Sequence, residues 1–504
     1  MSHFNIRFIS TSVAATILVL LNASCGHFYT DILNQKRIII PHSSDSELGT
    51  PPIEVRWART VTGGSNYSKF VSVSVGSDGS VYAAGDISGI GTINFGNGLT
   101  ATSTDYGSDF LLLKYNSSGN AQWVRTVTGG TQFSLNGVSA TLDGFLYAAG
   151  EIYGIDTYDF GNGVTAAGTN YGTNIVLVKY NSSGTAQWAK TVTGGSTNSY
   201  LSSVSAASDG SIYVAGEINA TGTINFGNGA TTAGTFIGDN ILLVKYNSSG
   251  TAQWAKTVIG GSHSSLFGVS AASDGSVYAA GYIDGAGTFN FANGVSATGT
   301  SSSSNMVLVK YNSFGNAQWA RTVSGGSSSD LFGVSAVSDG SVYAAGIISA
   351  GTYDFGNGVT GAGSGGIIIV KYNSSGTAQW ARTLTGGSND SCFRNVSAAS
   401  DGSVYAAGYI YGTGTFDFGN GVTAAGTYSR NNIILVKYNS SGTAQWARTT
   451  RSASNHSSFS GVSAATDGSV YATGYIWGNG TYDFGNCLTA ASADTFNILL
   501  VKYK

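Results

Sequence analysis

Short β-rich runs and polar turn sequences alternate along most of this chain. In one stretch, residues 204–207 and 212–215 flank a Ser-Asp-Gly-Ser sequence, which predicts a β-hairpin. Residues 241–246 and 252–258 flank an Asn-Ser-Ser-Gly sequence and predict a second hairpin. The run at 241–246 is apolar on both faces, which is typical of a strand covered on both sides. This stretch is therefore expected to form four antiparallel strands.

The same four-strand pattern is repeated along the chain, and a Trp marks the fourth strand of each repeat. Successive Trp residues lie about 65 positions apart, a period that indicates a repeat architecture. Four strands per repeat match one blade of a β-propeller. We interpret the Trp side chains as packing residues between blades. They are Trp57, Trp123, Trp188, Trp254, Trp319, Trp380 and Trp446.

The two ends of the repeat region complement each other. The region opens at residues 55–61 with a fourth strand that no first, second or third strand precedes. It closes at residues 498–503 with a third strand that no fourth strand follows. If the N-terminal strand completes the last blade, the ring closes and no sheet edge stays open. We therefore predict an all-β, seven-bladed propeller of four-stranded blades over residues 53–504.

Three phrases recur through these repeats: Lys-Tyr-Asn-Ser-Ser-Gly-x-Ala-Gln-Trp, Ser-Asp-Gly-Ser-Val-Tyr-Ala-Ala-Gly and Phe-Gly-Asn-Gly. They resemble the β-propeller repeat family called SBBP, and the resemblance covers about residues 53–504. It implies an exported bacterial propeller, often a surface or envelope protein. It implies no catalytic residues, because that family has no shared catalytic set.

The first 52 residues match no repeat. Arg7 precedes a short apolar run at 13–21, which predicts a lipoprotein-type export signal over residues 1–24. Cys25 follows small residues in an arrangement that resembles a relaxed, spirochaete-like lipobox, so we expect lipidation there; an ordinary cleaved signal is the alternative. Residues 25–52 hold all three prolines and are expected to form an extended tether. These features predict an outer-membrane lipoprotein of the cell envelope, held to the membrane by its lipid.

Charge and cysteine content narrow the partners further. The formal net charge is −3 and charged residues make up 10% of the chain, so no basic patch favours nucleic acid. Most Lys and Arg residues occupy two repeated positions. Beyond Cys25, the cysteines are Cys392 and Cys487 in neighbouring repeats. A disulfide between them and a pair of free thiols are both open.

Strand order predicts where the chain varies. The turns within the two hairpins share one face of the disc and barely change between repeats, whereas the other connections share the opposite face and hold most of the variation. Loops on a rigid scaffold usually carry function. We therefore place the candidate ligand site on the variable face.

One position of the second strand, directly after Ala-Gly or Thr-Gly, sharpens this choice. The first three repeats place carboxylates there: Asp86, Glu151 and Glu217. The fourth, sixth and seventh place Tyr282, Tyr409 and Tyr475, with Ile347 in the fifth. Two residues further on are Tyr153, Tyr411 and Trp477. We expect an acidic arc facing an aromatic arc, suited to sugar or protein recognition; packing beneath the long connections is the alternative interpretation.

These features favour a binding module for a protein or glycan. The alternatives are a structural or antigenic envelope protein without a specific ligand and, less favoured, a glycan-active hydrolase or lyase. No nucleophile elbow, phosphate loop, zinc motif or dinucleotide fingerprint is present, so we expect no enzyme, cofactor or metal. Carboxylates such as Asp159 are replaced by Asn in other repeats and do not match an EF-hand spacing.

Overall fold

The computed structural model describes residues 54–63, 67–103, 107–130, 132–194, 198–219, 221–386, 390–492 and 496–504. The expected signal, the lipidation site at Cys25 and the tether lie outside the described residues. Throughout the described ranges the secondary structure consists of strands and turns, with no helix. In that part of the chain, accordingly, no helix is long and apolar enough to cross a membrane.

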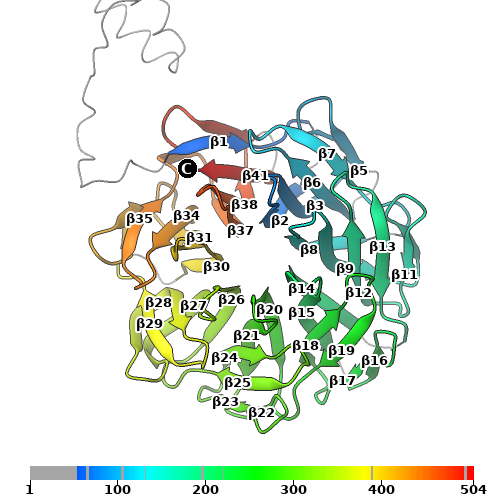
Figure 1. The fold of residues 1–504 in the computed structure, drawn as a ribbon. Coiled ribbons are helices and arrows are strands. Elements are labelled where there is room, and N and C mark those ends of the chain that lie inside the picture. Colours follow the sequence, from blue (N-terminus) through cyan, green and yellow to red (C-terminus); the bar gives the residue numbers. More distant parts are fainter. Residues whose placement is uncertain are drawn as a thin grey trace, which may run out of the picture.

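Seven four-stranded antiparallel blades are arranged around a central opening (Figure 1). Five of them are separate sheets, and the last and first blades are joined in one eight-stranded sheet by a parallel bridge between Tyr67 and Phe496. The first strand of each blade lies innermost, beside the opening. These strands are β2 (Tyr67–Val75), β8 (Phe133–Ala140), β14 (Asn198–Ala206), β20 (Ser264–Ala271), β26 (Ser329–Ala336), β30 (Cys392–Ala398) and β37 (Ser457–Ala464). The fold class predicted from the sequence is confirmed.

The other three strands of each blade follow outward from the axis. The second strands are β3 (Val81–Ser88), β9 (Leu146–Tyr153), β15 (Ile212–Asn219), β21 (Val277–Asp284), β27 (Val342–Asp354), β31 (Val404–Tyr411) and β38 (Val470–Trp477). The third are β6 (Ser108–Tyr115), β12 (Thr173–Tyr180), β18 (Asp239–Tyr246), β24 (Ser304–Tyr311), β28 (Thr360–Tyr372), β34 (Asn431–Tyr438) and β41 (Phe496–Tyr503). The outermost are β7 (Ala121–Arg125), β13 (Ala186–Thr191), β19 (Ala252–Lys256), β25 (Ala317–Arg321), β29 (Ala378–Thr383), β35 (Ala444–Arg448) and β1 (Val55–Arg59).

The first strand of the propeller completes its last blade. β1 pairs antiparallel with β41, with Trp57 opposite Lys502, and Figure 1 shows the two strands side by side. The pairing continues beyond the strands, because Glu54 and Lys504 exchange two backbone hydrogen bonds of 3.0 and 2.9 Å. The predicted ring closure is therefore confirmed, and β41 is left with no open edge.

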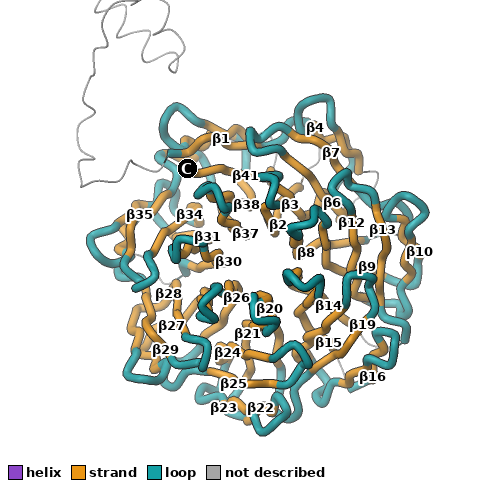
Figure 2. Tube along the Cα trace, in the orientation of Figure 1, coloured by secondary structure: helices purple, strands orange, loops and turns teal. Residues whose placement is uncertain are grey.

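A small hairpin extends the connection between the second and third strands of each blade. Its strands lie at the periphery of the ring (Figure 2). They are β4 (Gly91–Asn94) and β5 (Thr100–Ser103), β10 (Thr157–Asp159) and β11 (Thr165–Ala167), β16 (Thr223–Asn225) and β17 (Thr231–Ala233), β22 (Thr288–Asn290) and β23 (Ser296–Thr298), β32 (Thr415–Asp417) and β33 (Thr423–Ala425), and β39 (Gly480–Asp483) and β40 (Thr489–Ser492), with β36 (Ser452–Ala453) beside β39. In the fifth blade the long strands β27 and β28 form this hairpin themselves. The carboxylate of Asp159 accepts a hydrogen bond from the Gly161 N–H at 2.8 Å, so it acts as a turn residue.

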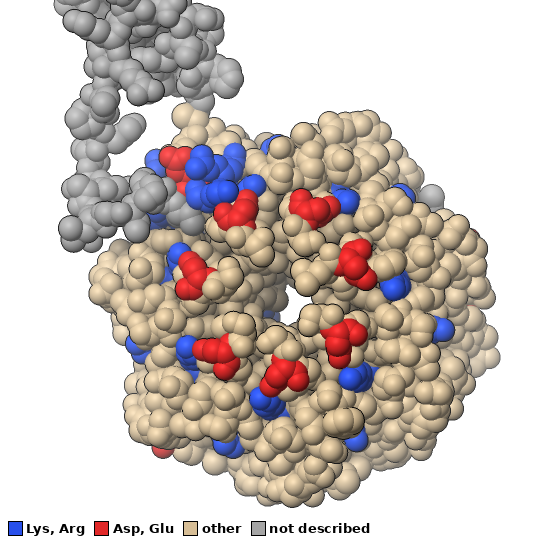
Figure 3. Space-filling view, viewed as in Figure 1, with Lys and Arg blue, Asp and Glu red and all other residues tan. Residues whose placement is uncertain are grey.

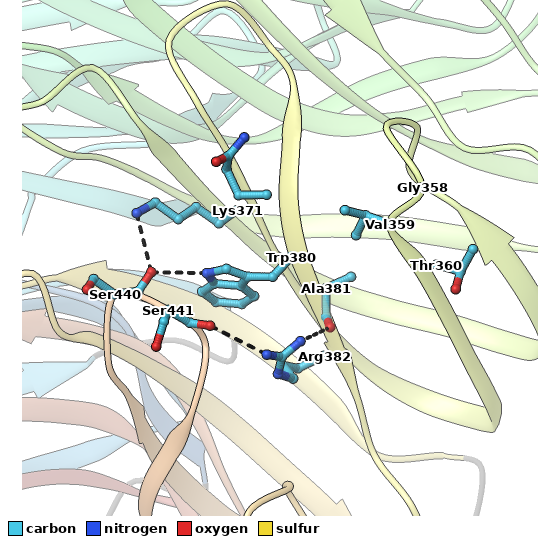
Figure 4. A pocket seen from close by; sticks show the side chains of 10 residues that line it. Gly358, Val359, Thr360, Lys371, Trp380, Ala381, Arg382, Ser440 and Ser441 are labelled. Atoms are coloured by element: carbon cyan, nitrogen blue, oxygen red, sulfur yellow. Dashed lines mark hydrogen bonds between the residues drawn. The ribbon is translucent and has the colours of Figure 1, made fainter.

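The repeated Trp residues join neighbouring blades, as the sequence predicted. In Figure 4 the Trp380 Nε1–H and the Lys371 ammonium both donate to the Ser440 carbonyl of the next blade, at 3.1 and 3.4 Å. Gly442, in the same turn, has φ +79°, and a Cβ there would meet the Trp380 ring at 2.5 Å. A glycine is therefore required where the ring packs. We call this set of contacts the inter-blade latch.

Candidate functional site

The innermost strands enclose an axial cavity of about 590 Å³, which we call the channel. Every one of the seven innermost strands contributes to its wall. The opening of the ring is visible in Figure 3. Because all seven blades meet here, the channel brings together side chains that lie hundreds of residues apart in sequence.

A β-bulge in each innermost strand aims one residue at the channel. Each pairing of a first with a second strand shifts register at the same place, for example between Phe70 and Ser72. Bulges commonly re-aim a side chain next to a functional site. The bulged residues all line the channel, and they differ between blades: Val71, Asn136, Ser202, Phe267, Phe332, Arg394 and Ser460.

The seven residues at the variable position of the second strands each pair with a residue of the innermost strand, and we call them the inner ring. They are Asp86, Glu151, Glu217, Tyr282, Ile347, Tyr409 and Tyr475. Three contacts connect this ring to the bulged residues. Asn136 donates to the Glu151 carboxylate at 2.9 Å, Phe267 packs on Tyr282 at 5.6 Å, and Arg394 lies over the Tyr409 ring at 5.7 Å.

The carboxylates of the inner ring form the expected acidic arc on three successive blades. Asp86 is 5% exposed, and the Lys69 ammonium lies 3.9 Å from its carboxylate. Burial raises the pKa of Asp86 to about 6, although Lys69 partly offsets that rise. Burial also raises the pKa of Glu151 to about 8, and the charges of Glu217 and Asp86 act in the same direction. The pKa of Glu151 therefore responds to the charges of Asp86 and Glu217 on the two neighbouring blades.

The opposite side of the channel is aromatic and carries one cation. The Phe267 and Phe332 rings lie 5.3 Å apart, and the Arg394 guanidinium lies 4.9 Å from the Phe332 ring centre. Within the described part of the chain, no carboxylate comes within ion-pair distance of Arg394. Burial raises the pKa of Tyr409, and the Arg394 charge partly opposes that rise. Aromatic rings therefore gather on this side, but Phe267 and Phe332 are not the predicted ones, and they lie beside a basic group that the sequence did not suggest.

The three outer aromatic candidates do not converge. Trp477 stacks on His456 and Phe496, with ring centres 4.2 and 4.0 Å apart, at the junction of the last and first blades. Tyr411 lies at the end of β31 in the sixth blade. Tyr153 is 46% exposed at the end of β9 in the second blade. Trp477 is thus part of a packed aromatic cluster, whereas Tyr153 stands apart on a separate blade.

The opposite face carries a different set of carboxylates. The turns between first and second strands hold an Asp in each blade, and Figure 3 shows acidic side chains spaced around the opening with basic ones beside them. Asp274 pairs with Lys310 at 3.6 Å, and Asp467 with Lys504 at 3.1 Å. The Asp339 carboxylate accepts the Ser341 N–H at 2.7 Å. These contacts stabilise turns, as the sequence predicted.

The structure decides the question of the cysteine pair. Cys392 is a free thiol, 1% exposed, on the innermost strand of the sixth blade. Burial raises the pKa of this thiol to about 12. A disulfide between Cys392 and Cys487 is therefore not formed. Across the described ranges, no group of three His, Cys, Asp or Glu residues is placed to hold a metal ion.

Sequence reasoning missed the bulged residues and Lys69. The sequence does contain a signal for the bulged residues, because one repeat position, two residues before a repeated Val, varies in residue type from blade to blade. The residues at this position are Val71, Asn136, Ser202, Phe267, Phe332, Arg394 and Ser460. The register shift conceals which face such a residue occupies, since alternation along the strand is interrupted there.

Comparisons with known proteins supply no identity. The chain matches no protein-family profile and no curated protein. A chain in the crystal structure of the Mitotic Checkpoint Complex is 11% identical, with a TM-score of 0.40 over 93% of this chain and 99% of that one. A protein of unknown function from Dyadobacter fermentans DSM 18053 is 9% identical, with a TM-score of 0.40 over 90% of this chain and all of that one. By its own sheets, this chain is a β-propeller, a scaffold typical of binding and interaction modules.

Proposed function

We propose that the chain is a binding module that recognises a glycan or protein at the inner ring and channel. The observation that carries this proposal is where the repeat is broken. An amide, two Phe rings and one guanidinium replace one another at the bulged position that lines the channel, and carboxylates and Tyr rings replace one another at the neighbouring position of the second strands. Buried charge is costly to maintain, so the buried carboxylates beside the innermost strands support a functional role.

The chemistry of the cavity favours a saccharide over a protein surface. Aromatic faces stack on the apolar faces of sugar rings, and carboxylates accept hydrogen bonds from hydroxyl groups. The cavity of about 590 Å³ has the size of a small-molecule site. A flat protein interface has no means to reach carboxylates that lie this deep, apart from an inserted side chain.

A binding screen of the propeller against glycans and extracellular-matrix proteins tests this proposal. We expect saturable binding that Glu151→Gln and Tyr282→Ala each weaken at least tenfold. Tyr411→Ala combined with Trp477→Ala tests the outer aromatic candidates in the same assay. Gln253→Ala, an exposed change on β19, is the matched control. If no ligand in the panel binds, a structural or antigenic envelope role replaces this proposal.

One observation supports a second candidate, a glycan-active hydrolase or lyase. Asp86 and Glu151 have pKa values of about 6 and about 8, so one is ionised and the other protonated near neutral pH. Such a separation is typical of an acid and base pair. Release of reducing sugar, lost in Asp86→Asn and Glu151→Gln, would favour the enzyme over the binding module.

We also infer export and lipid anchoring, with membership of the SBBP type of repeat. The supporting features are the apolar run at 13–21, Cys25 and the recurring phrases of the blades. Labelling with a fatty-acid analogue tests the anchor in expressing cells. We expect label and membrane association in the native chain and loss of both in Cys25→Ser. An unlabelled, cleaved native chain would favour the ordinary signal.

A further inference from the structure

We propose that Arg394 binds a carboxylate group of the ligand, so that the channel selects an acidic saccharide such as a uronic acid. This inference rests on the proposed function and narrows its ligand class. It starts from the position of Arg394, which is the bulged residue of β30 and part of the channel wall.

Arg394 is held in place without being neutralised. Its guanidinium lies against two rings, 4.9 Å from the centre of Phe332 and 5.7 Å from that of Tyr409. The ammonium group of Lys69, near the inner ring, lies 3.9 Å from the Asp86 carboxylate. In the described ranges, Arg394 has no carboxylate at ion-pair distance. The Tyr409 side chain also hydrogen-bonds to Arg394 and helps to hold it. A guanidinium has five N–H donors, so donors remain for an incoming anion.

The charge distribution of the channel indicates the kind of anion. Asp86, Glu151 and Glu217 occupy the first three blades, and Arg394 occupies the sixth. Among the described residues that line the channel, Arg394 is the charged one, and its single positive charge matches a singly charged anion better than a doubly charged phosphate. A singly charged, planar carboxylate matches the fork of one guanidinium.

The rest of the wall fits the body of a sugar ring. Phe267 and Phe332 offer aromatic faces beside Arg394. Asn136, Ser202 and Ser460 also line the channel and offer hydrogen bonds to hydroxyl groups. A uronic acid carries both groups, with its carboxylate at one end and hydroxyls around the ring.

The test compares acidic oligosaccharides with their neutral counterparts. The probes are glucuronate-, galacturonate- and mannuronate-containing tetrasaccharides, and the same tetrasaccharides with each carboxyl reduced to an alcohol. Calorimetry with the full chain measures their affinities. We expect at least one acidic probe to bind, and its reduced form to bind about ten- to a hundredfold more weakly.

Variants of two arginines separate recognition from folding. Arg394→Gln is expected to lose the same ten- to hundredfold for the acidic probe and nothing for a neutral ligand. Arg394→Lys keeps the charge without the fork and should recover only part of the affinity. Arg430→Gln, an exposed change in the connection before β34, should leave affinity unchanged. Circular dichroism confirms that each variant retains its sheets.

Three results would overturn the inference: equal binding of acidic and reduced probes, full affinity in Arg394→Gln, or no binding of any acidic probe. Equal binding leaves the module itself intact, because the channel then recognises neutral sugar. If a neutral glycan or a protein binds in the wider screen while every acidic probe fails, the acidic ligand alone is excluded. If nothing binds in either experiment, both proposals fall.

Discussion

Carboxylate residues occur in two regions of this propeller, and their surroundings differ between the two. On the face of the hairpin turns, each Asp lies in a short loop and is partly exposed, with a hydroxyl, N–H or Lys ammonium beside it. Next to the innermost strands, Asp86 and Glu151 are largely removed from water, and among the described residues the ammonium group that acts on both is that of Lys69. The contrast shows that positions where the residue type changes between repeats indicate a candidate site, whereas positions where it is constant indicate a structural role.

The pKa values of the carboxyl groups also differ between the two regions. Hydrogen bonds from Ser341 lower the pKa of Asp339 on the turn face, whereas burial raises the pKa of Asp86 and Glu151 at the axis. A lowered pKa stabilises the folded state, and a raised one destabilises it once the group is ionised. The turn carboxylate therefore stabilises the folded protein, whereas the buried carboxylates of the inner ring destabilise it when they are ionised.

The largest expected effect at neutral pH lies in the inter-blade latch. Trp380→Ala removes a ring that is 7% exposed and packs beneath Gly442, and should lower the free energy of unfolding by about 3–5 kcal/mol. Chemical denaturation followed by fluorescence measures this change. Gln379→Ala, at the exposed neighbouring position on β29, should change it by less than about 0.5 kcal/mol. Similar losses in both variants would contradict the assigned role of the Trp.

An effect of opposite sign is expected at the inner ring. The pKa of Glu151 rises from 4.5 to about 8 on folding. The protonated group is favoured in the folded state, so its stabilising contribution is complete below pH 4.5 and is lost as pH rises through 8. Glu151→Gln should therefore stabilise the protein by about 5 kcal/mol at pH 9 and by little at pH 4.5. Unfolding midpoints of both proteins, measured over a series of pH values, test this prediction. A stabilisation that does not change with pH would contradict the burial of the Glu151 carboxyl group.

The smallest effect belongs to the turn carboxylates. Asp339→Asn should destabilise by less than about 1 kcal/mol at pH 7, because the group is largely solvated. The pKa of Asp339 is lowered from 3.8, so its contribution is present above that value and disappears as pH falls through the folded pKa. The same pH series measures it. An increase in stability at pH 7 would place Asp339 with the channel carboxylates.

Much of the fold could be predicted because the repeat constrains it many times over. The Asp-Gly turns, the buried third strands and the unmatched strands at the two ends each indicate the same ring. Asp86, Glu151 and Glu217 were also predictable as an arc, because their position in the repeat sets their angular order. The order of the repeats along the sequence gives the order of the blades around the ring, which the sequence of one repeat alone does not give.

Arg394 and the Phe rings beside it were not predictable in the same way. Their position follows a bulge, and alternation along the strand therefore does not say which side they occupy. Trp477 shows the converse limit, because its sequence position suggested an open aromatic surface. His456, directly before β37, and Phe496, at the start of β41, belong to the same blade and pack against it instead.

The seam between β1 and β41 has a consequence for the order of folding events. Between ordinary neighbours, the hydrogen bond from the Val138 N–H to the Ser72 hydroxyl joins residues 66 positions apart. Where the last blade meets the first, the bond from the Ile498 N–H of β41 to the Ser68 hydroxyl of β2 joins residues 430 positions apart, and β1 pairs with β41 over a similar separation. For a flexible chain the longer closure costs about 1.7 kcal/mol more entropy. Blades should therefore assemble locally and early, and refolding should end in a late, slow phase when the first and last strands meet.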